Sequence, residues 1–244
     1  MDCAHISELL GPFLGPATAT ESQLADISIY IDLLLRWNAR VNLTSVRQPE
    51  EIVTRHFGES LFAGRHLFPQ SKGNEATGVL APPSRSPRGQ QTGGLSPSRR
   101  QAELNPDVSD LLDLGSGAGF PGLPIKIWNP SLRVTLVESN QKKATFLREA
   151  IRALTFTDIN VFPGRAQDFV GKAATVTLRA VEHFEAAVPV AASLVAPCGR
   201  LALLVSLSQV ESVRRLAPRF NWQEPVSIPL SNTRILAVGA LRDP

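Results

Sequence analysis

The chain has 244 residues, of which 43% are hydrophobic and 19% charged, a balance that is ordinary for a globular protein. No run approaches the roughly 18 apolar residues of a membrane span, the first residues do not resemble a signal peptide, and two cysteines are too few for a disulfide framework or a metal site. We therefore expect a cytoplasmic monomer with no membrane partner, and the net charge of +3 permits an RNA partner without requiring one.

Residues 1–69 form an N-terminal region in which we predict helices. From about Thr20, apolar residues recur at three- and four-residue spacing, which is typical of an amphipathic helix. Thr20 and Gln23 match a capping box at its start, and a second helix is predicted to begin near Pro49. We interpret the region as a helical appendage that contacts RNA.

Basic side chains of this region could contact RNA phosphates, with Trp37 as a stacking surface for a base. The alternative is that Trp37, Asn42 and Thr44 pack the region against the rest of the protein, and the sequence does not decide between the two. The candidate RNA-binding residues are Arg36, Arg40, Arg47, Arg55, His56 and Arg65.

Residues 70–106 show no hydrophobic periodicity and are rich in proline, glycine, serine and arginine. Such a segment cannot bury enough apolar surface to offset the entropy of ordering, so we predict a disordered insert. Its arginines could touch RNA, but a solvated linker is the favoured interpretation.

Residues 107–244 alternate between strand and helix patterns, which predicts a parallel sheet. Two late strand-like runs, at 222–229 and 233–239, have only a short turn between them and should be antiparallel. A parallel core with a terminal antiparallel hairpin is typical of the class I S-adenosylmethionine (SAM)-dependent methyltransferases, with a Rossmann-like, mostly parallel, seven-stranded α/β sheet. The core strands are predicted at 108–114, 133–138, 159–163, 174–179 and 200–206, and the helices at 121–128, 140–154, 183–195 and 208–217.

The segment 113–122, which joins the first of these strands to the first helix, carries the most specific signal. Its glycines, at 115, 117 and 119, follow G-x-G-x-G, whereas a dinucleotide fingerprint would need a glycine in place of Phe120. The next strand ends at Glu138, 21 residues after Gly117, where a carboxylate can accept hydrogen bonds from ribose hydroxyls. This pattern favours SAM; a NAD site and a tight turn that binds nothing are the alternatives.

Further motifs occur in a fixed order along the chain. They are W-N-x-x-x-N-L-T from Trp37, the pair Arg55-His56, G-x-G-x-G-F-P-G from Gly115, E-S-N-x-K-K from Glu138, G-R-A-Q-D-F from Gly164, and Arg179-Ala180. In this order they resemble the GidB family of bacterial small-subunit rRNA guanine-N7 methyltransferases. The resemblance covers nearly the whole chain except the first twenty residues and the insert.

The resemblance implies methyl transfer from SAM to guanine N7 in 16S rRNA, with the small ribosomal subunit or its assembly intermediate as partner. Guanine N7 carries a lone pair and no proton, so no general base is required. In agreement, no D/N-P-P-Y motif follows the fourth strand. The implied SAM contacts are Gly115, Phe120, Ala166, Gln167 and Arg179; Gly117 and Glu138 complete the predicted cofactor site, and Arg179 and Asn140 are the candidate catalytic residues.

The chain departs from the family pattern at several positions. Gln167 stands where an acid is usual, Leu178 where a serine is common, and Val205-Ser206 where a lysine is expected. Three alternatives therefore stay open: a methyltransferase of another substrate, a non-catalytic RNA- or ribosome-binding module, and a NAD-linked oxidoreductase. Cys198 follows a proline, as the nucleophile of cytosine-C5 methyltransferases does, but its place before the fifth strand favours a turn residue.

Overall fold

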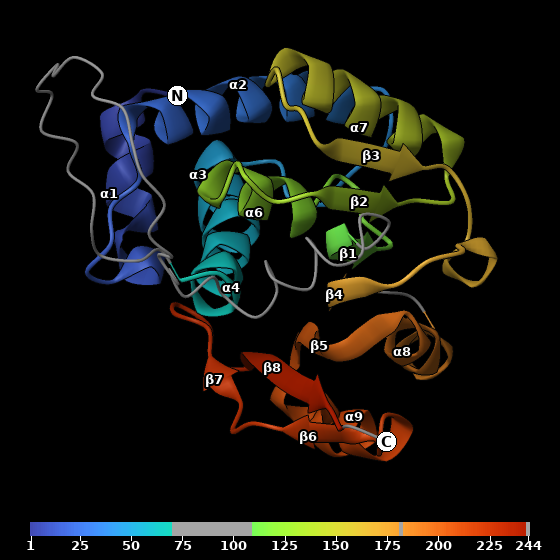
Figure 1. The fold of residues 1–244 in the computed structure, drawn as a ribbon. Helices are drawn as coiled ribbons and strands as arrows, with labels where there is room; N and C mark the ends of the chain where they lie inside the picture. Colours follow the sequence, from blue (N-terminus) through green and yellow to red (C-terminus); the bar gives the residue numbers. More distant parts are fainter. Residues whose placement is uncertain (70–108, 181–182, 243–244) are drawn as a thin grey trace, which may run out of the picture.

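The computed structural model of the protein describes residues 1–69, 109–180 and 183–242. Its centre is a sheet with the strand order β3-β2-β1-β4-β5-β8-β6, and β7 also pairs with β8 (Figure 1). Strands β1 to β5 are parallel, whereas β8 is antiparallel to β5, and β6 and β7 are antiparallel to β8. The strands are β1 (Ser109–Leu114), β2 (Val134–Val137), β3 (Ile159–Phe162), β4 (Ala173–Arg179), β5 (Val195–Ser206), β6 (Phe220–Trp222), β7 (Val226–Ser227) and β8 (Arg234–Leu241).

The parallel core and the antiparallel end confirm the predicted architecture, with one difference. The run predicted at 222–229 is divided between two short strands, so the described residues form eight strands rather than seven. Pro225 lies between the two and has no N–H to donate to a strand ladder, which explains the interruption. The insert predicted at 70–106 lies outside the described residues.

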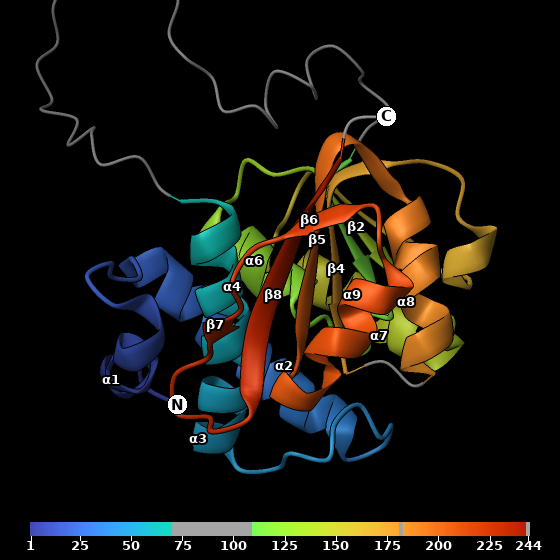
Figure 2. The same cartoon turned by 90° about the horizontal axis from the view of Figure 1, so that it is seen from below.

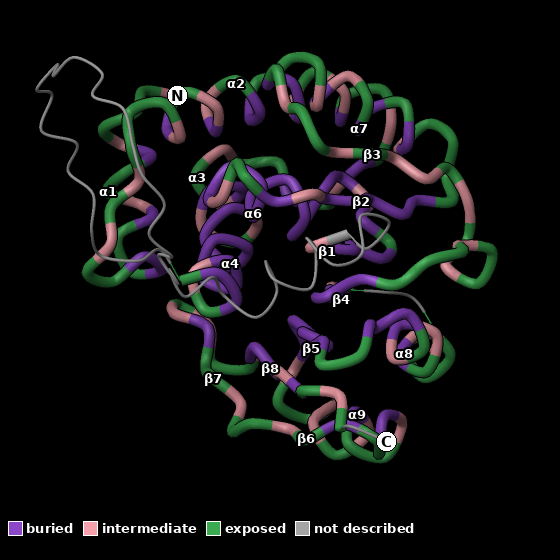
Figure 3. The backbone as a smooth tube through the Cα atoms, in the orientation of Figure 1, coloured by how far each residue is buried: buried purple, intermediate pink, exposed green. Residues whose placement is uncertain are grey.

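Helices cover both faces of the sheet (Figures 1 and 3). Successive side chains of its strands point to opposite faces and pack into two different cores. On β1, Leu111 packs into one core, whereas Leu112 and Leu114 pack into the other. The second core also contains residues of α8 and α9. The helices that follow β1 are α6 (Gly122–Trp128), α7 (Gln141–Ala153), α8 (Phe184–Ser193) and α9 (Val210–Leu216).

The first core joins the sheet to the N-terminal helices, which Figure 2 shows against one side of it. Leu34 of α2, Phe57, and Leu136 of β2 are all buried in this core. Its side chains also come from α6 and α7. The N-terminal helices are α1 (Cys3–Leu14), α2 (Glu21–Asn38), α3 (Pro49–Glu51), the π-helix η1 (Ile52–Gly58) and α4 (Glu59–Leu67).

The two helix starts predicted in this region, at Thr20 and near Pro49, are confirmed, and one helix was not predicted. Helix α2 begins at the capping box, where Thr20 and Gln23 each accept the other's backbone N–H. Helix α1 is additional: Gly11 and Pro12 lie inside it and weaken its helical pattern, although its buried face is regular. None of the described helices is long and apolar enough to cross a membrane.

Candidate active site

The glycine-rich turn lies at the carboxyl end of β1 and has a backbone that few other residues could adopt. Gly115, Gly117 and Gly119 have positive φ angles of 66°, 58° and 88°. A Cβ at Gly119 would collide with the Tyr30 hydroxyl, which donates to the carbonyl of Ala118. A Cβ at Gly117 would meet only the Gly115 carbonyl, at 3.8 Å. Gly119 is therefore needed for packing against α2, while Gly117 leaves open space.

Glu138 lies beside this turn, just beyond the end of β2, as the spacing predicted. Its Oε2 accepts the N–H of Gly117 at 2.8 Å and its Oε1 accepts the N–H of Asn140 at 2.7 Å. The side chain is buried, and each oxygen keeps a second acceptor position. The carboxylate is thus held rigidly where a pair of ribose hydroxyls could donate to it.

This edge of the sheet offers an open backbone and hydrogen-bonding groups that suit SAM. The open backbone at Gly115 and Gly117 allows close approach, and Glu138 supplies the acceptor. Beyond β3, Ala166 and Gln167 lie in a short 3-10 helix, η2 (Ala166–Asp168), where Gln167 is exposed. Because β1, β2 and β3 are parallel, these groups all lie at the same edge.

Asn140 has a local role that the sequence did not predict. Its Oδ1 accepts the N–H groups of Lys142 and Lys143 at 3.0 and 3.2 Å, so it caps the N-terminus of α7. The cap orients the chain immediately after Glu138. A direct catalytic role for Asn140 stays a prediction, and it would have to use the side-chain amide nitrogen.

Phe120 is packed into the protein rather than exposed at an open site. Its ring stacks with Tyr30 at a centroid distance of 5.5 Å and with His56 at 4.8 Å. Only 7% of the residue is exposed. The aromatic ring thereby joins the glycine turn to the N-terminal helices, and its contact with the cofactor stays a prediction.

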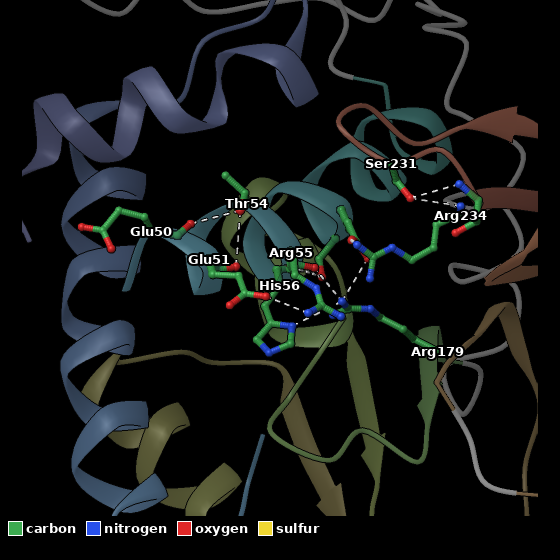
Figure 4. A network of polar contacts seen from close by, with 11 residues as sticks. Glu50, Glu51, Thr54, Arg55, His56, Arg179, Ser231 and Arg234 are labelled. Carbon is green, nitrogen blue, oxygen red and sulfur yellow. Dashed lines mark hydrogen bonds and ion pairs between the residues drawn. The ribbon is translucent and has the colours of Figure 1, made fainter. Parts of the chain in front are cut away.

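Arg179, at the end of β4, is the centre of a buried polar network (Figure 4). Its Nη2 donates to the carbonyl of Arg55 at 2.6 Å and to Glu59 Oε2 at 3.0 Å, and it also contacts His56 Nδ1 at 3.3 Å. The other carboxylate oxygen of Glu59 pairs with Arg234, the first residue of β8, at 2.7 Å. The salt bridge between Arg179 and Glu59 is therefore buried, and together with Arg234 it connects β4, α4 and β8.

Burial dominates the ionisation of this network. It raises the pKa of Glu59, against the opposing effect of Arg179 and Arg234. It also lowers the pKa of His56 to about 3, with Arg179 as the next contribution. His56 is therefore neutral near pH 7 and lacks the charge for the predicted phosphate contact.

A second buried carboxylate, that of Asp113 at the end of β1, stabilises the glycine turn. Its Oδ1 accepts the hydroxyl of Thr177 at 2.8 Å and its Oδ2 accepts the N–H of Gly122 at 3.1 Å. Burial raises the pKa of Asp113 to about 6, although both hydrogen bonds oppose the shift. Asp113 thus fixes where the turn enters α6.

The other predicted RNA-binding residues are spread over the N-terminal region. Arg36, Arg40 and Arg47 are exposed. Arg55 is exposed too but pairs with Glu51 at 2.7 Å, and Arg65 donates to the carbonyl of Leu14. The structure brings Arg55 and His56 to the Arg179 network.

Three residues of the site were not singled out in the sequence: Glu59, Arg234 and Asp113. A signal existed for two of them, since Asp113 lies between two leucines of a predicted strand and Glu59 lies in a mainly apolar segment between Phe57 and Ala63. Arg234 has no such signal. Cys198 lies inside β5, in the irregularity between the two registers of the β4–β5 pairing, and has a φ of 57°. The prediction that it precedes the fifth strand is therefore wrong, although its positive φ is typical of a turn or bulge residue. It lies near the start of β4, whereas Arg179 ends that strand.

A parallel sheet with this strand order, a glycine turn after β1 and an acid after β2 defines a class I SAM-dependent methyltransferase. The magnesium protoporphyrin IX methyltransferase ChlM of Synechocystis PCC 6803, solved with bound SAM, has this fold too. It superposes with a TM-score of 0.55 over 89% of this chain and 97% of its own, at 14% identity.

Sequence comparison places the chain within one family of this class. The family described as rRNA small subunit methyltransferase G (GidB) matches residues 23–74 and 100–232. A ribosomal RNA small subunit methyltransferase G of Stenotrophomonas maltophilia (strain K279a) is 34% identical over 82% of this chain and 78% of its own length. The ribosomal RNA small subunit methyltransferase G of Xanthomonas axonopodis pv. citri (strain 306) is 34% identical over 86% of this chain and 82% of its own length. The chain belongs to the rRNA small subunit methyltransferase G family.

Proposed function

We propose that this protein transfers the methyl group of SAM to N7 of a guanine in small-subunit 16S rRNA. The observation that carries the proposal is the buried Glu138 carboxylate, held beside the open glycine turn in a member of this family. Ribosomal subunits and their assembly intermediates are cytoplasmic, so we also propose that the protein acts there, as a monomer.

The carboxyl edge of β1 to β4 would hold the cofactor, which supplies an electrophilic methyl group on a sulfonium. Glu138 would accept the ribose hydroxyls, and the backbone of η2 would face the adenine. Gln167 replaces the usual acid of the family there, so an amide would take part in that contact. The proposed cofactor-binding residues are Gly115, Gly117, Phe120, Glu138, Ala166, Gln167 and Arg179.

Catalysis then requires alignment rather than a base. Guanine N7 attacks through its in-plane lone pair, so methyl, sulfur and N7 must lie nearly in line, with the base out of its stack. Arg179 is the main candidate for the floor of this pocket, because its side chain is fixed at the end of β4 and its Nε and Nη1 make no hydrogen bond to the described residues. Fixed donors of this kind stabilise charge without reorganising during the reaction.

RNA would be bound by exposed arginines of the N-terminal region. Arg36, Arg40 and Arg47 are exposed and available to phosphates, and Arg55 adds a cation that is shared with Glu51. His56 is neutral and engaged on both ring nitrogens, so it is not part of the proposed RNA contact.

The test uses purified protein, labelled SAM and small subunits from a strain that lacks this methylation. After the reaction, borohydride and aniline cleave RNA wherever N7-methylguanine has formed. We expect a single new cleavage site. Methyl transfer without cleavage would contradict N7 as the acceptor, and no transfer by a protein that binds SAM would contradict the rRNA substrate.

A further inference from the structure

The loop after α2 is built around one buried side chain, Asn38. Its Oδ1 accepts the N–H groups of Leu43 and Thr44 at 2.9 and 3.0 Å, and its Nδ2 donates to the carbonyl of Thr44 at 2.9 Å. Asn38 is only 6% exposed. The W-N-x-x-x-N-L-T motif therefore fixes both backbone polar groups of Thr44, its last residue.

The hydroxyl of Thr44 is fixed as well, and the direction of its hydrogen bonds can be deduced. A guanidinium has no acceptor, so His56 Nδ1 can meet Arg179 Nη2 at 3.3 Å only as an acceptor, and it shares one of the two hydrogens that also face Arg55 and Glu59. A neutral imidazole with Nδ1 as acceptor carries its proton on Nε2, and the low pKa of His56 agrees with the neutral form. His56 Nε2–H therefore donates to Thr44 Oγ1, at 2.7 Å.

The N–H of Val46 donates to the same oxygen at 3.1 Å. Thr44 Oγ1 thus accepts two hydrogen bonds, which occupies both of its lone pairs. A threonine hydroxyl can normally donate or accept, but here it can only donate. None of the described residues accepts its proton, and Thr44 is partly exposed.

This donor lies at the edge of the sheet where methyl transfer would occur. Thr44 contacts His56, whose ring stacks on Phe120 of the glycine turn at 4.8 Å, and His56 in turn contacts Arg179 at the end of β4. The hydroxyl is therefore close to both strands, β1 and β4, that border the proposed pocket.

We propose that the Thr44 hydroxyl donates to O6 of the target guanine and so selects guanine over adenine. This inference rests on the proposed function. Guanine presents two acceptors on its N7 edge, N7 and O6, whereas adenine presents N7 and an amino donor. Because N7 must stay free to attack the methyl group, O6 is the acceptor on that edge that the protein can bind. A donor-only hydroxyl would face the amino group of adenine without a hydrogen bond.

The experiment compares two substrates, small subunits reconstituted with guanine or with 2-aminopurine at the target position. 2-Aminopurine keeps N7 but has hydrogen in place of O6. We expect the wild-type protein to prefer guanine by about tenfold in kcat/KM of labelled methyl transfer, the effect of one hydrogen bond. Thr44→Val has the same shape without the donor and should methylate both substrates at similar rates, whereas Thr44→Ser should keep the preference.

An equal preference for guanine in the wild-type protein and in Thr44→Val would overturn the inference. Failure of the wild-type protein to form N7-methylguanine in normal subunits would overturn the proposed function instead, so the two are distinguishable. SAM affinity and thermal unfolding are measured for each variant. If Thr44→Val is unfolded, Thr44→Ala takes its place in the same comparison.

Discussion

The Glu59 carboxylate and the Arg179 guanidinium form a buried ion pair, 3.0 Å between Oε2 and Nη2, that joins α4 to the end of β4. The two side chains are 2% and 10% exposed. Arg234 binds the other oxygen of Glu59, so the cluster holds two cations and one anion. The N-terminal helices are thereby tied by charge as well as by apolar packing to the edge that would carry out methyl transfer.

Replacing Glu59 with glutamine should strongly destabilise the protein, because Arg179 and Arg234 would be left without an anion. The loss of one partner from a buried ion pair costs about 3 kcal/mol or more of unfolding free energy. Urea denaturation measures this. Glu51→Gln is the matched control in the same helical segment, since it breaks the exposed pair with Arg55, at 2.7 Å, and should cost under about 1 kcal/mol. Equal losses in the two variants would contradict a buried role for Glu59.

Glu138→Gln should weaken SAM binding by about tenfold or more, because a charged acceptor of the ribose hydroxyls is lost. Isothermal titration with SAM measures the change in Kd. The control is Asp110→Asn, because Asp110 accepts the N–H of Arg133 at 2.9 Å near the other end of the same two strands. SAM affinity should stay at the wild-type value in that control, and a loss of similar size in both variants would indicate a general effect on folding.

Reversing the charge of Arg36 and Arg40 to glutamate should weaken binding to small subunits by roughly tenfold or more and reduce its salt dependence, because phosphate contacts are lost. Binding of SAM should be unchanged. Arg214 and Arg215 are exposed on α9, which covers the other face of the sheet, and their reversal serves as the control. Filter binding at several salt concentrations separates the outcomes. If the two double charge reversals weaken RNA binding equally, the N-terminal region is not the specific contact.

The residues that could be predicted from the sequence are those whose partners are close along the chain or are fixed by strand order. Glu138 meets Gly117 because a parallel βαβ unit brings the ends of neighbouring strands together. The capping box at Thr20 is local in the same way. Such contacts follow from spacing along the chain or from strand order, whereas the ribose contact of Glu138 stays a prediction.

The polar network around Arg179 could not be predicted, because its members are joined only by tertiary packing. Glu59 and Arg179 are 120 positions apart, and their meeting depends on how α4 lies across the sheet. No local pattern indicates that His56 is neutral, because its low pKa results from burial and from Arg179, which meets it only in the folded protein. The sequence alone therefore assigns His56 and Arg55 to an RNA surface, whereas the ring of His56 and the carbonyl of Arg55 belong to the internal network.

The neutral state of His56 predicts a loss of stability in acid. Its pKa is lowered from 6.5 to about 3, so between these values the unfolded chain binds a proton that the folded protein does not. Stability contributed by the neutral ring is complete above pH 6.5 and is lost as the pH falls towards 3. In His56→Gln, whose amide can still accept from Arg179 and donate to Thr44, the difference in unfolding free energy between pH 7 and pH 4.5 should be smaller by about 2 kcal/mol. Urea denaturation at the two pH values measures it, and an equal difference in the variant and the wild-type protein would show that His56 is not held neutral by the fold.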